Sequence, residues 1–184
     1  VNKNLTMVSG PVAAMAASAQ TVGQWYGEAS YQMQTLTDKS SDQLGKFKTN
    51  NLSLGVGRVM MNNLAVEGFY QLPSSTATNT YPGPATIDLK FASGYGFALK
   101  PFVNLSNQFE LFGRLGRIHG ESDYTAKDAK GTETGTNKIT KNFYGVGLAY
   151  KVTPTISVVA DYKKVTGLTD TSVSTNSIGL RYNF

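Results

Sequence analysis

The sequence lacks cysteine altogether and contains a single histidine, His119, among 184 residues. Disulfides and thiolate metal sites are therefore excluded, and a lone histidine is poor evidence for a metal centre. Beyond residue 20 no run of 18 apolar residues is present, so no transmembrane helix is expected. The chain also lacks a glycine-rich phosphate loop and a basic face interleaved with aromatic residues. We expect no cofactor, no metal and no nucleic-acid partner.

What is present indicates one folded domain behind an export signal. Apolar residues make up 40% of the chain and charged residues 16%, which excludes a disordered protein. Residues 1–19 combine one lysine, a weakly apolar stretch and the small-residue cleavage motif Ala17-Ser18-Ala19. This predicts a signal peptide over residues 1–19 and an exported domain over residues 20–184. An ordered N-terminal helix is the alternative, although Pro11 interrupts the stretch.

The dominant pattern after residue 20 is an alternation of apolar and polar residues with a period of two. Eight segments show it, and none keeps a helical period, which predicts an all-β protein. The segments are Val22–Thr35, Asn51–Arg58, Leu64–Leu72, Ile87–Phe102, Phe109–Ile118, Phe143–Val152, Ile156–Lys164 and Asn176–Phe184. Long polar connections such as "GESDYTAKDAKGTETGTNKIT" alternate with short turns. This plan predicts an eight-stranded antiparallel up-and-down transmembrane β-barrel with its long loops at one end.

Alternation alone does not say which face lies inside, because a soluble lipocalin-like barrel would bury the apolar set. Glycine placement favours the membrane barrel. Most strand glycines, among them Gly57, Gly116 and Gly147, fall on the polar face. Glycine is retained where space is tight, and the lumen of an eight-stranded barrel is only wide enough for side chains to fill it. We therefore expect the polar face inside and the apolar face against lipid.

The second half of the chain resembles a known family. "QFELFGRLGRIHGESDYT", "FYGVGLAYKVTPTISVVADYKKV" and "SIGLRYNF" are similar to the last four strands of the transmembrane domain of outer-membrane protein A (OmpA) and its opacity-type relatives. The resemblance implies the outer membrane of a Gram-negative bacterium. It also implies that the terminal strand is the signal read by the barrel-assembly machinery. The outward residues of that strand would carry this signal: Ile178, Leu180, Tyr182 and Phe184.

The polar face carries charges that we expect to form a lumen network. They are Glu28, Glu67, Asp88, Lys90, Glu110, Arg114, Asp161, Lys163 and Arg181. Glu67 and Lys90 lie at similar distances from the loop that joins the third and fourth segments, so they should be at similar depth on neighbouring strands. They are the first candidate pair. Two positions depart from the family pattern, because Ala149 and Val159 stand where charges are expected. The network is interpreted as a plug of paired charges, and an ion path is the alternative.

Three classes of function remain open. The leading one is a non-enzymatic, monomeric barrel that contributes to envelope integrity and contacts outer-membrane lipids, lipopolysaccharide or host surfaces through its loops. The second is a small, low-conductance channel. The third is a lipid A-modifying enzyme, since Glu121, Ser122 and Asp123 follow His119. Proximity in sequence is not triad geometry, and the segment lacks the His-x-Ser spacing of the lipid A deacylases, so no catalytic residue is assigned.

Overall fold

The computed structural model describes residues 20–38, 46–73, 77–80, 86–128, 131–169 and 171–184. The predicted signal peptide, residues 1–19, lies outside the described residues. The described strands are β1 (Trp25–Asp38), β2 (Lys46–Met61), β3 (Leu64–Gln71), β4 (Ala77–Thr80), β5 (Thr86–Asn104), β6 (Phe109–Asp128), β7 (Gly131–Lys151), β8 (Ile156–Val165) and β9 (Thr171–Asn183). Within these ranges no helix is long and apolar enough to cross a membrane.

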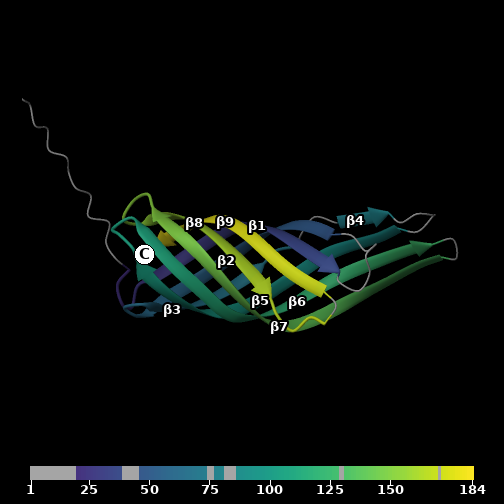
Figure 1. Ribbon diagram of the computed structural model, residues 1–184, viewed down its shortest axis with the longest axis horizontal. Coiled ribbons are helices and arrows are strands. Elements are labelled where there is room, and N and C mark those ends of the chain that lie inside the picture. The colour runs from purple at the N-terminus through teal and green to yellow at the C-terminus, as the bar shows by residue number, and fades with distance from the viewer. Residues whose placement is uncertain (1–19, 39–45, 74–76, 81–85, 129–130, 170) are drawn as a thin grey trace, which may run out of the picture.

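Eight of the strands close into a ring, seen from the side in Figure 1. The order of neighbours is β3-β2-β1-β9-β8-β7-β6-β5, and pairing between β3 and β5 completes the circle. Every neighbouring pair is antiparallel. The short β4 pairs with the part of β5 that extends past the end of β3. Each strand of the ring pairs with the next ring strand along the chain, and β9 pairs with β1. The predicted eight-stranded up-and-down barrel is therefore confirmed.

One predicted loop is instead a long hairpin. The sequence predicts a long polar connection between Ile118 and Phe143, but β6 continues to Asp128 and β7 begins at Gly131. The two strands pair without interruption up to Asp128 opposite Gly131. Figure 1 shows this hairpin reaching beyond the ends of β8 and β9. Threonine and tyrosine favour strands, and the segment keeps enough of them to stay extended although it lacks an apolar face.

The apolar face of the barrel points outward. In β9 the side chains of Ile178, Leu180 and Tyr182 are 53%, 57% and 54% exposed, whereas the alternate residues Arg181 and Asn183 are buried. The same alternation holds in β7 from Phe143 onward and in most of β8. A soluble lipocalin-like barrel would have the opposite arrangement. An outward band of this kind is stable only when lipid covers it, so the membrane interpretation follows.

Inward glycines make room for large side chains, as the sequence pattern predicted. A Cβ atom at Gly57 would overlap the ring of Tyr26, and one at Gly147 would overlap the ring of Phe112. Gly68 lies on the outward face, and a Cβ atom there would meet nothing within 4 Å. The contrast shows that the lumen is filled.

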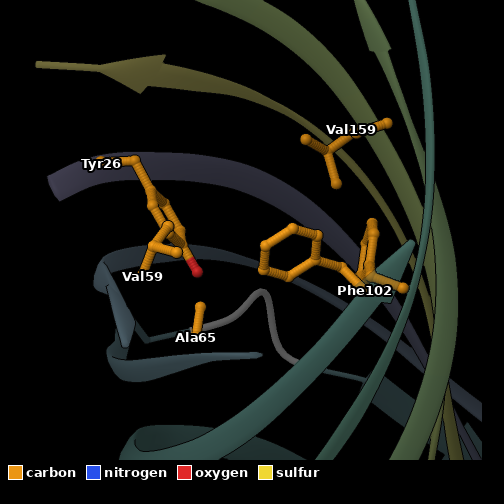
Figure 2. Packing of buried hydrophobic residues seen from close by; sticks show 7 residues of the cluster. Tyr26, Val59, Ala65, Phe102 and Val159 are labelled. Atoms are coloured by element: carbon orange, nitrogen blue, oxygen red, sulfur yellow. The ribbon is translucent and has the colours of Figure 1, made fainter. Parts of the chain in front are cut away.

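The lumen is not polar throughout. Near the short-turn end seven buried residues form an apolar cluster: Tyr26, Val59, Ala65, Phe102, Phe112, Ala149 and Val159 (Figure 2). Ala149 and Val159 are the two positions that depart from the family's charge pattern, and both belong to this cluster. Apolar side chains therefore fill much of the turn end of the barrel, where they pack beside buried cations: Lys100 lies over the ring of Phe112, and Lys151 is 4% exposed.

Candidate functional site

The candidate site is a chain of eight charged side chains across the middle of the lumen. Six strands contribute to it: β1, β3, β5, β6, β8 and β9. Contacts run from Lys100 through Glu110, Arg181 and Glu28 to Arg114. Arg114 then contacts both Glu67 and Asp161, and Asp161 contacts Lys163. Four are cations and four are carboxylates, so the charges balance. We call this group the charge chain.

Arg114 is the branching point of the charge chain. Its Nε lies 2.6 Å from Oε2 of Glu67, and its Nη2 lies 2.7 Å from Oε1 of Glu28. Its Nη1 contacts Asp161, which also accepts a hydrogen bond from Ser177. The planar guanidinium offers donors along several directions, so one arginine can bridge three carboxylates from three strands. Lysine in its place would be a single point charge.

Arg181 and Lys100 form the lower end of the charge chain. Nη1 of Arg181 lies 2.8 Å from Oε1 of Glu110, and Nζ of Lys100 lies 2.9 Å from the same oxygen. Nη2 of Arg181 reaches Oε2 of Glu28 at 3.2 Å, which links this end to Arg114. Both cations also lie over the ring of Tyr26, at 5.0 Å each. Aromatic faces attract cations, so Tyr26 and the carboxylates together offset the loss of water.

Seven of the nine predicted network residues lie in the charge chain, and two do not. Asp88 and Lys90 lie beyond a register shift between Phe91 and Ser93. An extra residue in one strand reverses which face the following side chains take. Lys90 is consequently opposite Asp123, and its side chain is exposed. Asp88, opposite Thr125, follows the same alternation as Lys90 in this part of β5.

The predicted pair of Glu67 with Lys90 does not form, although both residues lie in the described ranges. Glu67 is opposite Ala98 of β5, eight residues from Lys90, which corresponds to about 26 Å along a strand. The cation beside Glu67 is Arg114, and Tyr26 donates a second hydrogen bond to it at 2.8 Å. Counting from the loop failed because β5 runs well beyond the end of β3.

Lys100 is a member of the charge chain that the sequence reasoning missed. It is fully buried, two residues after Ala98 on the inward alternation. Continuing the count from Gly94, Gly96 and Ala98 would have identified it as inward. Tyr26 was missed for another reason, because an inward tyrosine cannot be told from an outward one by residue type.

The charge chain fills the lumen and leaves little space for solvent. The cavity next to Arg114 has a volume of about 30 Å³ and is bordered on its other side by Phe69 and Phe143. This is room for about one or two water molecules. Fully buried ions that are paired and hydrogen-bonded are a stable plug, whereas conduction needs a wide, hydrated path. The geometry supports a plug.

The segment considered for catalysis is divided among unrelated contacts. Nδ1 of His119 lies 2.7 Å from the hydroxyl of Thr140, and its ring packs on Tyr95 at 5.1 Å. The carboxylate of Glu121 pairs with Lys138 at 2.8 Å, and Asp123 accepts a hydrogen bond from Thr136. His119 therefore meets a threonine hydroxyl and a tyrosine ring in these contacts, and neither Ser122 nor a carboxylate, so the contacts here do not assemble the Ser-His-acid triad.

The terminal strand completes the barrel. β9 pairs with β8 and with β1 along its whole length, and the amide of Phe184 donates to the carbonyl of Trp25 at 3.0 Å. The ring of Phe184 stacks on that of Tyr182 at 6.2 Å and is 66% exposed. The four residues predicted to carry the assembly signal therefore share the outward face of the closing strand.

Solved structures similar to this chain are outer-membrane barrels. Ail, the attachment invasion locus protein of Yersinia pestis, has a TM-score of 0.63 and 20% identity over 89% of this chain and 100% of its own. Neisserial surface protein A (NspA) has a TM-score of 0.58 and 16% identity over 87% and 97%. OprG from Pseudomonas aeruginosa has a TM-score of 0.54 and 14% identity, over 89% of this chain and 96% of its own. At these identities the likeness shows the fold.

The sequence comparisons are consistent with the fold. No curated protein matches this sequence. The family model described as "Outer membrane protein beta-barrel domain" matches residues 5–184, nearly the whole chain. The expected family is thus confirmed, and membership implies the outer membrane of a Gram-negative bacterium. With its ring of eight antiparallel strands, outward apolar face and filled lumen, the chain belongs to the outer-membrane β-barrel domain family.

Proposed function

We propose that this protein is a non-enzymatic, non-conducting barrel that supports the envelope and contacts lipopolysaccharide and external surfaces at its loop end. The observation that carries the proposal is the charge chain, a balanced plug packed against the apolar cluster. A lumen filled in this way serves rigidity rather than passage. The long β6–β7 hairpin then offers surface outside the membrane for contact with other molecules.

Outward basic residues at the loop end support contact with lipopolysaccharide. Arg117 is the first charged outward residue after Leu115 on β6, and Lys164 is the first after Tyr162 on β8. Tyr144, opposite both Leu115 and Lys164, lies between the two strands. Cations directly beyond an apolar band are placed to bind the phosphates of an anionic outer leaflet. A structure of Ail was solved in complex with the heparin analogue sucrose octasulfate, another polyanion, which is in keeping with an anionic ligand.

The lipopolysaccharide contact is tested in bilayers with and without that lipid. We expect lipopolysaccharide to raise the midpoint of thermal unfolding of the parent, and the double variant Arg117→Gln/Lys164→Gln to lose most of this increase. Arg58→Gln is the matched control, because Arg58 is an exposed outward cation at the opposite, short-turn end, stacked on Trp25. An equal loss in the control and the double variant would refute a site at the loop end.

The channel is tested separately in planar bilayers. We expect at most rare, small openings from the parent protein. Steady conductance whose charge selectivity reverses in Arg114→Glu, at unchanged thermal stability, would favour the channel. Deletion of the gene followed by envelope-stress and adhesion assays then tests the cellular role.

A further inference from the structure

A second cavity lies at the loop end of the lumen, and its lining differs from that of the charge chain. Its volume is about 120 Å³. Five aliphatic side chains line it: Leu36, Ile118, Ile139, Val165 and Val173. We call this cavity the mouth cup.

The aliphatic residues of the mouth cup form a continuous band across neighbouring strands. Val173 of β9 lies opposite Leu36 on one side and Val165 on the other. All of them occupy inward positions, and all but Ile118 lie outside the eight segments predicted from the sequence. Ile139 is 39% exposed, so part of this apolar surface is in contact with water. Covering concave apolar surface releases that water, which is the usual driving force for binding a small molecule.

An aromatic pair separates the mouth cup from the charge chain. Phe143 lies opposite Val165 of the cup and packs edge-to-face against Phe69, with 5.7 Å between ring centroids. The same two rings border the small cavity next to Arg114. A molecule in the mouth cup therefore rests above the rings, and the charge chain lies below them. The cavity therefore ends within the barrel.

The size and polar edge of the mouth cup define a class of ligand. An apolar cavity of about 150 Å³ in another protein holds benzene, so this cup suits a body of about one ring. Its polar edge is formed by Gln34, Thr49 and Ser122, with Gln34 accepting from the Thr49 hydroxyl at 3.4 Å. Lys90 borders the cup, but its side chain is exposed and lies opposite Asp123.

We propose that the mouth cup binds a small uncharged molecule that has a ring-sized apolar body and one hydrogen-bonding group. The aliphatic band would take the body, and the amide and hydroxyls of the polar edge would take the hydrogen-bonding group. This function does not depend on the lipopolysaccharide contact, which uses outward residues. Each can therefore fail without the other.

The isoleucine methyl groups allow a test with an internal control. Ile118 and Ile139 line the mouth cup, whereas Ile156 and Ile178 face outward to lipid. With isoleucine methyls labelled and the full chain in nanodiscs, benzyl alcohol should produce saturable NMR shifts at Ile118 and Ile139. Ile156 and Ile178 should move only slightly and in proportion to concentration, as for partitioning into the bilayer. Equal, unsaturated shifts at all four methyls, or no shift in the cup, would refute the proposal.

Two variants and two further probes test the chemistry of the mouth cup. Val165→Thr keeps the shape of the wall but adds a hydroxyl, and it should weaken benzyl alcohol binding at least about tenfold. Val152→Thr, at an exposed position near the short turns, is the control and should change nothing. If Val165→Thr does not fold, Val173→Thr takes its place.

Toluene, which lacks the hydroxyl, should bind more weakly than benzyl alcohol in the parent, and Ser122→Ala should reduce that difference. Tighter binding of benzoate than of benzyl alcohol would show that Lys90 supplies a counter-ion, and would overturn the assignment of an uncharged ligand.

Discussion

Replacing Arg114 with methionine removes the guanidinium from the charge chain but keeps a long, unbranched side chain in the lumen. Three carboxylates lose a partner, and they are affected unequally. Glu28 keeps Arg181 at 3.2 Å, and Asp161 keeps the hydroxyl of Ser177 and Lys163 at 3.7 Å. Within the described ranges, the one direct partner that Glu67 keeps is the hydroxyl of Tyr26. The variant thus leaves one buried carboxylate without an adjacent cation.

The magnitude follows from that single uncompensated charge. Removing one partner of a buried ion pair costs about 3–5 kcal/mol, because the remaining ion is still desolvated. We expect a loss of this size in the free energy of unfolding, measured by urea titration in lipid vesicles and followed by Trp25 fluorescence and gel mobility. Adding Glu67→Gln to Arg114→Met removes the orphaned charge, and the double-variant cycle should give a coupling energy of about 1–3 kcal/mol.

Lys138→Met is the matched control for the Arg114 experiment. Lys138 also pairs with a glutamate, and the hydrogen bond to Glu121 raises the pKa of its ammonium group. This pair lies in water on the β6–β7 hairpin, where screening weakens it, so no measurable loss of stability is expected. An Arg114→Met variant within about 1 kcal/mol of the parent, or a Glu67→Gln addition with no effect, would refute the plug.

Three further predictions concern assembly, packing and location. Phe184→Ala should reduce the amount of assembled barrel in cells far more than the stability of the folded barrel, because one exposed aromatic contributes at most about 1–3 kcal/mol; equal losses in both assays would make Phe184 a packing residue. Gly147→Ala should destabilise by about 1–3 kcal/mol because its methyl group meets Phe112, whereas Gly68→Ala should be near neutral, and urea titration distinguishes them. The mature protein should fractionate with the outer membrane and migrate differently on gels before and after heating, whereas recovery as a soluble periplasmic monomer would contradict the membrane assignment.

The sequence by itself determined the fold class, the number of strands in the ring and the face that meets lipid. A period of two is a local property, fixed by the opposite directions of successive side chains, so it can be read without knowing any partner. The glycines at positions 57 and 147 carried the same local information, because only a crowded lumen requires them. Residue type and alternation also placed seven members of the charge chain on the inner face.

Only the tertiary structure decided which charges meet. Pairing depends on register and on strand length, which are set between strands far apart in sequence, such as β3 and β5. The register shift between Phe91 and Ser93 took Lys90 out of the alternation that faces the charge chain, and the extension of β5 beyond β3 separated it from Glu67. Arg114 instead gathers carboxylates from β1, β3 and β8, and the mouth cup gathers aliphatic residues from five strands. These groupings exist only once the sheet closes, because closure brings inward side chains of non-adjacent strands within contact distance.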